Sequence, residues 1–156
     1  MPLFWFEPRA ERDALARLPV YIVDSGHGHG CYGFPYLADQ GLKIATHGMG
    51  TPADPDTLDR GAHPDDEAPV REFIKRYLPV ADGPVREAKI CMYTVTPDEH
   101  FIVDVAGPLA FASACSGHGF KFASVMGEIL ADLALEGRTR HPIGFLSASR
   151  FATVRA

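Results

Sequence analysis

The segment that most constrains the fold of this chain lies between residues 109 and 137. An apolar run from Leu109 to Ala114, long enough for one buried strand, is followed by the glycine-containing stretch Ser116–Phe122. Beyond it, apolar residues recur at three- and four-residue steps, the period of an amphipathic helix. Gly137 follows, and glycine is a common residue just past a helix end. The order predicts a strand, a tight turn and a helix.

The turn between that strand and that helix has the chemistry of a binding loop. Gly117 and Gly119 lack a Cβ atom, so the turn can bring backbone N–H groups close to a ligand. The N-terminus of a helix has a partial positive charge of roughly half an elementary charge, and Lys121 adds a full one. Together they favour an anion or an electron-rich group. From these residues alone, an ordinary strand–helix turn with a solvated lysine is an equal alternative.

The rest of the chain predicts an α+β fold with a mainly antiparallel sheet. Short runs rich in β-branched and aromatic residues alternate with short turns, which favours a meander. Strands are predicted at 3–6, 20–23, 31–36, 41–47 and 85–94, with a hairpin of 101–104 and 109–114 around Gly107. We expect all these strands to form one sheet, followed by the C-terminal strand–turn–helix.

One helix is predicted to pack on this sheet. Residues 51–63, rich in proline, aspartate and glycine, are typical of a surface loop. Apolar residues then repeat with a helical period, at Val70, Phe73, Ile74, Tyr77 and Leu78. Pro69 should lie in the first turn, where its missing N–H costs least, and Pro79 should end the helix.

Composition and charge exclude several classes of protein. The net charge is −5, so nucleic acid is not an expected partner. No apolar run approaches the ~20 residues of a membrane-spanning helix, and the N-terminus does not resemble a signal peptide. Cys31, Cys91 and Cys115 are odd in number and widely spaced. This spacing argues against a disulfide framework and predicts a reducing compartment, the cytoplasm.

Two further patterns are weak. Gly28–Gly33 matches the letters GxGxxG, but the dinucleotide fingerprint requires a helix after it. Phe34–Tyr36, with a proline at its centre, is a poor helix start, so we interpret the glycines as a hairpin turn. His27 and His29 have no third ligand near them in the sequence, and no metal site is predicted.

A third pattern concerns charged residues on a strand. Lys43 and His47 are four residues apart, so on a strand both side chains face the same side, and Tyr32 belongs to the neighbouring predicted strand. A lysine between Leu42 and Ile44 needs a partner or a task if that side is buried. The alternative is a sheet whose second face is exposed to water.

Three motifs together resemble a known family. Ser116–Phe122, Cys91–Thr94 and Pro97–Asp104 are similar to the C-terminal half of monomeric sarcosine oxidases and N-methyltryptophan oxidases. These are FAD-dependent amine oxidases that act on secondary amino acids. The resemblance runs from Trp5 to Phe151, and the three motifs occur in the same order.

The sequence also departs from that family. Ala114–Ser116 stands where relatives more often have Gly-Phe-Ser, and the hairpin around Gly107 is shorter. The family's initial βαβ unit with its glycine loop and acidic ribose ligand is not found. The resemblance therefore implies a substrate-binding, catalytic domain at 1–105 and a flavin-contacting strand–turn–helix at 106–156, without the N-terminal nucleotide-binding half.

The resemblance also implies roles for individual residues. Catalytic roles fall to Lys43, His47 and Tyr32, and the substrate site is expected to comprise Tyr32, Tyr93, His47 and Lys121. The flavin would contact Cys91, Ser116, Gly117, His118, Gly119 and Lys121.

The chemistry of two of these residues is specific. The family's lysine activates oxygen, because a nearby cation stabilises the superoxide that the first electron forms; Lys43 matches it. The family's cysteine bonds covalently to the flavin, and Cys91 matches that one, although a strand cysteine is more often a buried small hydrophobe. Tyr93, two residues on, is expected to share a face with Cys91.

The function implied is flavin-dependent oxidation of sarcosine, N-methyltryptophan or a similar amine to an imine, with O₂ reduced to hydrogen peroxide. FAD is expected, attached through Cys91, but not retained by this chain alone. The alternative is a non-catalytic truncated module or a partner chain. We expect one open, concave face on which these side chains converge: Tyr32, Lys43, His47, Cys91, Tyr93 and Lys121. A separate FAD-binding polypeptide or a second copy would then cover this open face.

Overall fold

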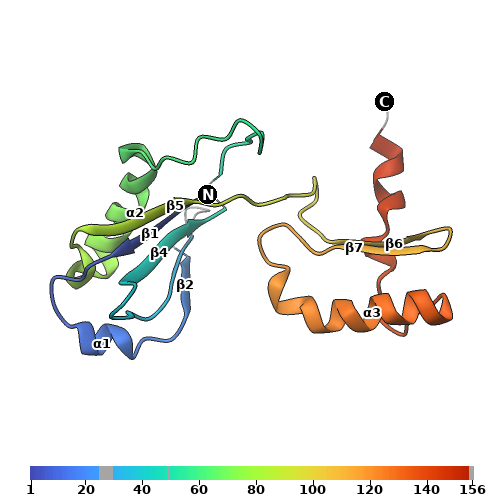
Figure 1. Cartoon of the computed structure of the whole chain (residues 1–156), viewed down its shortest axis with the longest axis horizontal. Helices are drawn as coiled ribbons and strands as arrows, with labels where there is room; N and C mark the ends of the chain where they lie inside the picture. The colour runs from blue at the N-terminus through green and yellow to red at the C-terminus, as the bar shows by residue number, and fades with distance from the viewer. Residues whose placement is uncertain (25–29, 49, 155–156) are drawn as a thin grey trace. The chain divides into compact units, whose positions relative to one another are not determined.

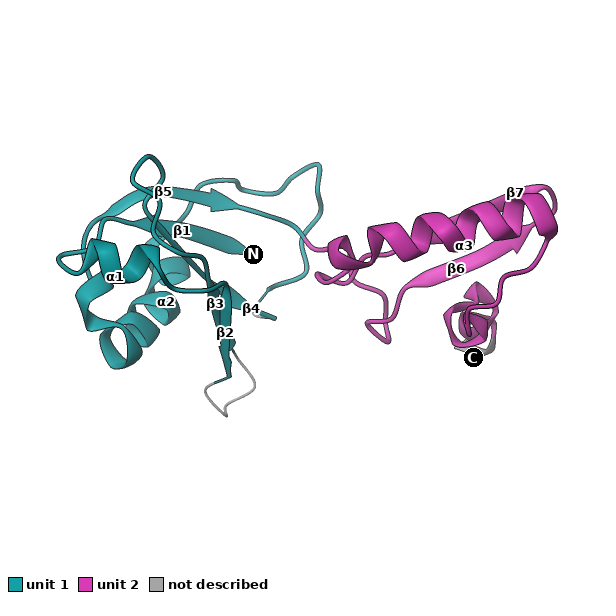
Figure 2. Ribbon diagram, turned by 90° about the horizontal axis from the view of Figure 1, so that it is seen from below, with its two compact units in different colours: residues 1–92 teal, residues 93–156 magenta. Residues whose placement is uncertain are grey.

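The computed structural model describes residues 1–24, 30–48 and 50–154. The chain forms two compact units, residues 1–92 and 93–156, coloured separately in Figure 2. Each unit has its own hydrophobic core. The predicted functional division at 105/106 stays a prediction. In the part of the chain that the structure describes, no helix is long and apolar enough to cross a membrane.

The first unit is built on a five-stranded sheet in which every pair of neighbours is antiparallel (Figure 1). The order of the strands is β2-β3-β4-β1-β5. Their bounds are Pro2–Phe6 (β1), Tyr21–Asp24 (β2), Gly30–Gly33 (β3), Leu42–His47 (β4) and Val85–Ile90 (β5). The predicted α+β class and mainly antiparallel sheet are confirmed. The predicted meander is confirmed only for β2, β3 and β4, because β1 lies between β4 and β5 and not beside β2, the next strand in the sequence.

Alternation along the strands divides the sheet into two faces. One face forms the core of the unit, where Phe4 and Phe6 lie against Leu42 and Ile44, all at most 1% exposed. Cys31 is also part of this core, and its burial raises the pKa of the thiol to about 11. The other face carries Trp5 and the alternate residues of β4, which are Lys43, Ala45 and His47.

Two helices accompany this sheet: α1 (Arg12–Ala16) and α2 (Pro64–Tyr77). The apolar face of α2 is buried in the core as predicted, through Val70, Phe73 and Ile74. The prediction for Pro69 is wrong, because the helix begins at Pro64 and places Pro69 in its interior. The early start is stabilised by the backbone N–H of His63, which donates to the Asp66 carboxylate at 2.9 Å.

The second unit consists of a hairpin, a helix and a C-terminal segment. Strands β6 (Ile102–Ala106) and β7 (Leu109–Ser113) pair antiparallel and precede α3 (Ala123–Glu136). Met126, Ile129 and Leu133 of α3 pack with Phe101 and Val103 in the core. The predicted helix end is confirmed, since Gly137 caps α3 in the left-handed conformation, φ 69°.

Short 3₁₀ helices complete both units. They are η1 (Pro79–Ala81), η2 (Phe120–Phe122), η3 (Gly144–Leu146) and η4 (Ala148–Val154).

Two sequence predictions about strands are wrong. We expected one sheet, but β6 and β7 form a separate two-stranded sheet. The strand predicted at 85–94 ends at Ile90, so Cys91 and Tyr93 lie beyond it. The expectation that these two side chains share a strand face therefore loses its basis. Local apolar patterns identify strands, but they do not say which strands pair across long separations.

Candidate functional site

Strand β4 positions the predicted residues of the first unit. Its pairing sets Lys43 opposite Trp5 of β1, Ala45 opposite Tyr32 of β3, and His47 opposite Gly30. Directly paired residues point to the same side of a sheet. Lys43, His47 and Tyr32 therefore share the face that lies opposite the core.

Lys43 lies between two aromatic rings. Its Nζ atom is 5.1 Å from the centroid of the Trp5 ring and 5.0 Å from that of Phe34. Both are within the range of cation–π attraction. Among the residues that the structure describes, no carboxylate forms an ion pair with Lys43. Within that part of the chain, the lysine is thus a cation held by rings and not by a negative partner.

Tyr32 and His47 extend this aromatic face along β4. Their rings meet edge to face, with centroids 6.3 Å apart and planes at 85°. Tyr32 makes a similar contact with Phe34, at 6.3 Å and 75°. Ala45 lies directly beside Tyr32 and is fully buried. A small residue at this central position allows the rings to close over the strand.

Cys91 follows directly after β5. Its backbone N–H donates to the Met1 carbonyl at 2.8 Å, and the Met1 ammonium donates to the Cys91 carbonyl at 2.9 Å. These bonds continue the β1–β5 register, in which Leu3 pairs with Lys89. Cys91 therefore extends the row that contains Lys89, on the face of Trp5. Its thiol is exposed, unlike that of the buried Cys31.

In the second unit, the predicted turn is shaped by its glycines. Gly117 has a φ of 78°, and a Cβ atom there would lie 2.6 Å from the Tyr93 ring. A Cβ atom on Gly119 would lie 1.5 Å from the Ala114 carbonyl oxygen. Both positions thus require glycine, and the Tyr93 ring packs directly on the turn.

Polar contacts hold the other residues of this turn. His118 stacks on Phe101 with ring centroids 4.8 Å apart, and its Nδ1 lies 2.8 Å from the Ser116 carbonyl oxygen. Because a carbonyl only accepts, Nδ1 must carry the proton. Lys121 Nζ donates to the His118 carbonyl at 3.1 Å. The Ser116 hydroxyl accepts from the Thr96 N–H at 3.3 Å.

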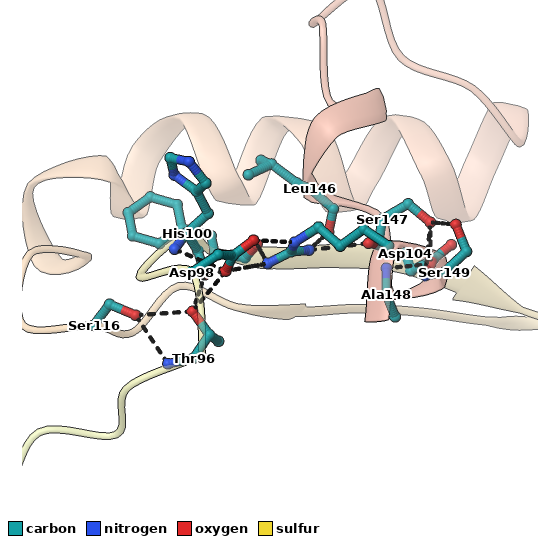
Figure 3. A network of polar contacts seen from close by, with 11 residues as sticks. Thr96, Asp98, His100, Asp104, Ser116, Leu146, Ser147, Ala148 and Ser149 are labelled. Atoms are coloured by element: carbon teal, nitrogen blue, oxygen red, sulfur yellow. Dashed lines mark hydrogen bonds and ion pairs between the residues drawn. The ribbon is translucent and has the colours of Figure 1, made fainter. Parts of the chain in front are cut away.

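Sequence reasoning missed the network that fixes the C-terminal segment of this unit (Figure 3). Arg150 donates to both carboxylate oxygens of Asp98, at 2.6 and 3.2 Å, and also to four backbone carbonyls. This guanidinium holds the pKa of Asp98 well below its usual range. The Asp104 carboxylate accepts from the Val105 N–H, the Ser147 hydroxyl and the Ala148 N–H, and these bonds lower its pKa.

The site predicted from the sequence thus falls into two groups. Lys43, His47, Tyr32 and Cys91 belong to the first unit, whereas Tyr93 and the turn belong to the second. Sequence reasoning also missed Trp5 and Phe34 as neighbours of Lys43. Their aromatic character was visible in the sequence, but their proximity depends on the strand register.

The weak motifs can be placed only in part. Residues Gly30–Gly33 form strand β3, so the second half of the GxGxxG pattern is not a loop leading into a helix. Gly28, His27 and His29 lie outside the described residues. Within residues 1–24, 30–48 and 50–154, no cluster of three metal-ligating side chains occurs.

A comparison with models of protein families shows the class to which this protein belongs. The model of the "FAD dependent oxidoreductase" family matches residues 3–133. This match covers most of the chain, so the chain belongs to the FAD-dependent oxidoreductase family.

Individual relatives then give the branch of that family. The chain is 46% identical to a monomeric sarcosine oxidase of Bacillus sp. strain NS-129 over 88% of its own length and 36% of that enzyme's. It is 40% identical to the monomeric sarcosine oxidase of Streptomyces avermitilis, over 99% of this chain and 42% of that enzyme. It is 33% identical to the N-methyl-L-tryptophan oxidase of Salmonella enteritidis, over 95% of this chain and 41% of that enzyme. The predicted resemblance is confirmed, and the chain spans about two fifths of these enzymes.

A solved structure supports the fold. NikD, an unusual amino acid oxidase essential for nikkomycin biosynthesis, superimposes in its open form with a TM-score of 0.68. The alignment covers 94% of this chain and 40% of NikD, at 20% identity. At this identity, the likeness shows a shared fold and no more.

Proposed function

We propose that this chain is the part of a flavin-dependent amine oxidase that binds the substrate and contacts the flavin. The substrate would be a secondary amino acid such as sarcosine or N-methyltryptophan, converted to an imine while O₂ becomes hydrogen peroxide. The observation that carries this proposal is Lys43, a cation on the aromatic face of β4, in a chain 46% identical to a monomeric sarcosine oxidase.

The side chains present fit a flavin. A flavin is flat and electron-accepting, and it is stabilised in its reduced form by nearby positive charge. The first unit offers the ring-held Lys43 and an exposed thiol, Cys91. The second offers the glycine turn and Lys121. When bound, the cofactor takes two electrons and a proton from the C–H bond beside the amine and passes the electrons to O₂.

The residues of this chain would divide the remaining tasks. Tyr32, His47 and Tyr93 would form the walls of the substrate site, and Lys121 would hold the substrate carboxylate by its charge. The Lys43 ammonium would stabilise the negative charge that develops on oxygen. Ser116, Gly117, His118 and Gly119 would present backbone groups to the cofactor.

Cys91 would attach the cofactor covalently. Its thiol would lose a proton and form a carbon–sulfur bond at the benzenoid edge of the flavin, in place of a C–H bond whose hydrogen would leave as a second proton. The electron pair of that C–H bond would pass to O₂, which would take up the two protons to give hydrogen peroxide. An exposed thiol at the end of β5 is accessible for such a bond, and the residue matches the family motif.

One observation favours the alternative, a non-catalytic module or partner chain. The chain spans 36–42% of the length of the relatives above. Within the described residues, no strand leads through a glycine loop into a helix of the kind that holds the pyrophosphate of a dinucleotide in a parallel βαβ unit. A separate FAD-binding polypeptide or a second copy of the chain would then cover the open face. In either case, three free cysteines suit a cytoplasmic protein.

The test compares the chain alone with the chain supplemented by the remaining part of a related oxidase. The chain alone should neither retain FAD nor oxidise sarcosine or N-methyltryptophan. In the supplemented enzyme, Lys43→Met should slow flavin reoxidation by O₂ by about 10²-fold, as loss of one stabilising charge does, and leave flavin reduction nearly unchanged. Stopped-flow absorbance measures both half-reactions.

Lys75→Met is the matched control, because Lys75 lies on α2 and should affect neither half-reaction. Equal slowing of both half-reactions by Lys43→Met would show that the lysine positions the substrate instead. Turnover by the chain alone would contradict the proposal that it is only part of the enzyme. Yellow colour that survives denaturation, and is lost in Cys91→Ala, would support the covalent bond.

A further inference from the structure

The position of Lys43 between two rings follows from strand register. In the β1–β4 pairing, Trp5 lies directly opposite Lys43. On the other side, the Phe34 N–H donates to the Lys43 carbonyl at 3.1 Å, so the β3–β4 register continues one residue past the strand. Lys43 therefore has an aromatic residue as cross-strand neighbour on each side.

We propose that Trp5 and Phe34 are positioning residues that hold the Lys43 ammonium between their rings and keep its charge available to a small anion or an electron-rich oxygen. The geometric basis is the pair of ring distances, 5.1 and 5.0 Å, around one Nζ atom. We call this arrangement of Trp5, Lys43 and Phe34 the clamp. The inference rests on the proposed function for its link to oxygen, but the clamp itself requires no flavin.

The chemistry of the clamp differs from that of an ion pair. An aromatic face attracts a cation through its quadrupole, whereas a carboxylate would neutralise the cation and occupy its N–H donors. The neighbouring lysine shows the contrast. Lys89 Nζ lies 5.4 Å from the Trp5 centroid, yet it is paired with Glu87 at 2.7 Å. Of these two cations beside Trp5, only Lys43 therefore keeps an unneutralised charge.

The composition of the chain makes this clamp measurable. The chain has four lysines, Lys43, Lys75, Lys89 and Lys121, and one tryptophan, Trp5. Reductive dimethylation with ¹³C adds methyl probes to each lysine and keeps its charge. Methyl groups over an aromatic face are shifted upfield in the proton dimension, so the signal of Lys43 should lie upfield of that of Lys75, for which no ring contact is found among the described residues.

The first experiment removes the rings one at a time. Phe34→Leu and Trp5→Leu should each move the Lys43 signal about halfway toward that of Lys75, and the double variant should remove the difference. Phe122→Leu is the matched control: it should move the signal of Lys121, which lies 5.2 Å from that ring, and leave that of Lys43 unchanged. A Lys43 signal unaffected by Phe34→Leu, in a chain with unchanged strand signals, would overturn the clamp.

The second experiment tests whether the clamped charge attracts anions. Iodide and acrylamide both quench tryptophan fluorescence, but only iodide is concentrated by a nearby positive charge. The ratio of the two quenching constants for Trp5 should fall about twofold in Lys43→Met at low salt. It should change little in the double variant Glu87→Gln/Lys89→Gln, which removes both members of the neighbouring ion pair and leaves the net charge beside Trp5 unchanged. Equal falls in the two variants would overturn the assignment of the available charge to Lys43.

Both measurements use the flavin-free chain. They can therefore succeed when the oxygen half-reaction fails, and fail when it succeeds. If the NMR and quenching results show no clamp but Lys43→Met slows flavin reoxidation, this inference alone is overturned. If they show the clamp but Lys43→Met leaves flavin reoxidation unchanged, only the proposed function is overturned.

Discussion

At the scale of single residues, the turn of the second unit depends on the lack of a side chain. Gly119 is buried, and a Cβ atom there would lie 1.5 Å from a backbone oxygen. Its φ of −75° is open to any residue, so only the approach of Ala114 requires glycine. The turn is thus specified at this position by close packing and not by an unusual dihedral angle.

We predict that Gly119→Ala destabilises the second unit by about 1–3 kcal/mol, the usual cost of an inserted methyl group in a packed site. Gly127→Ala is the control with the opposite sign. It lies in α3, where an added Cβ atom would meet nothing within 4 Å, so alanine should stabilise the helix by about 0.5–1 kcal/mol. Denaturant unfolding followed by α3 hydrogen exchange measures both. A Gly119→Ala variant as stable as the wild type would show that the turn can shift away from Ala114.

At the scale of elements, α2 contains a proline that helix preferences disfavour. Pro69 cannot donate the backbone hydrogen bond that its position in the helix offers to the Asp65 carbonyl. The helix forms because its apolar face is buried, through Val70 and Ile74 among others, and because its first turn is well capped. Tertiary packing therefore overrides a local preference here.

Pro69→Ala should accordingly stabilise the first unit by roughly 1–2 kcal/mol. The gain from a restored helical bond, up to about 3 kcal/mol, is reduced by the greater freedom of the unfolded alanine chain. Trp5 fluorescence during urea unfolding measures the change, since Trp5 lies in this unit. Destabilisation would mean that the proline ring itself contributes to the packing of α2.

The elements show which parts of the fold could be predicted from sequence. Apolar periodicity identified β4, α2 and α3 to within a few residues, because each buries one face. Pairing was harder. That β6 and β7 form their own sheet, and that Trp5 and Phe34 flank Lys43, depends on contacts between distant residues. The Asp98–Arg150 pair, 52 residues apart, had no local signal.

At the scale of the whole molecule, the described residues form two hydrophobic cores, one in each unit. The core of the first unit lies between a sheet and α2. The second unit, residues 93–156, packs one hairpin against one helix. A two-stranded hairpin is stable only when packed against something else. The polar network around Asp98 therefore supplements a small apolar core.

We predict that Asp98→Asn destabilises the second unit near neutral pH and leaves the Trp5 transition of the first unit unchanged. Because the folded-state pKa of Asp98 is lowered, chiefly by the hydrogen bond from Arg150, its contribution is fully present above the unfolded pKa of about 4. It is lost as the pH falls through the lower folded-state pKa. The stability difference between wild type and Asp98→Asn should therefore shrink below about pH 4.

Hydrogen exchange of α3 reports the second unit, and Trp5 fluorescence reports the first. Asp59→Asn serves as the control, because Asp59 is exposed and bonded only within its own loop and to His63 among the described residues. A difference that stays constant as the pH falls would contradict the role of the Asp98 charge. Transitions that shift together would show that the two units unfold as one.

The alternation along β4 has a consequence for how such a protein can change. Leu42 and Ile44 belong to the core, whereas Lys43 and His47 face the side where chemistry is proposed. Substitutions at the second pair leave the packing of the first intact. A single strand thus separates the residues that fold the unit from those with proposed catalytic roles. A library limited to position 47, whose side chain is proposed to line the substrate site, would vary that wall and keep the core and the oxygen-activating lysine.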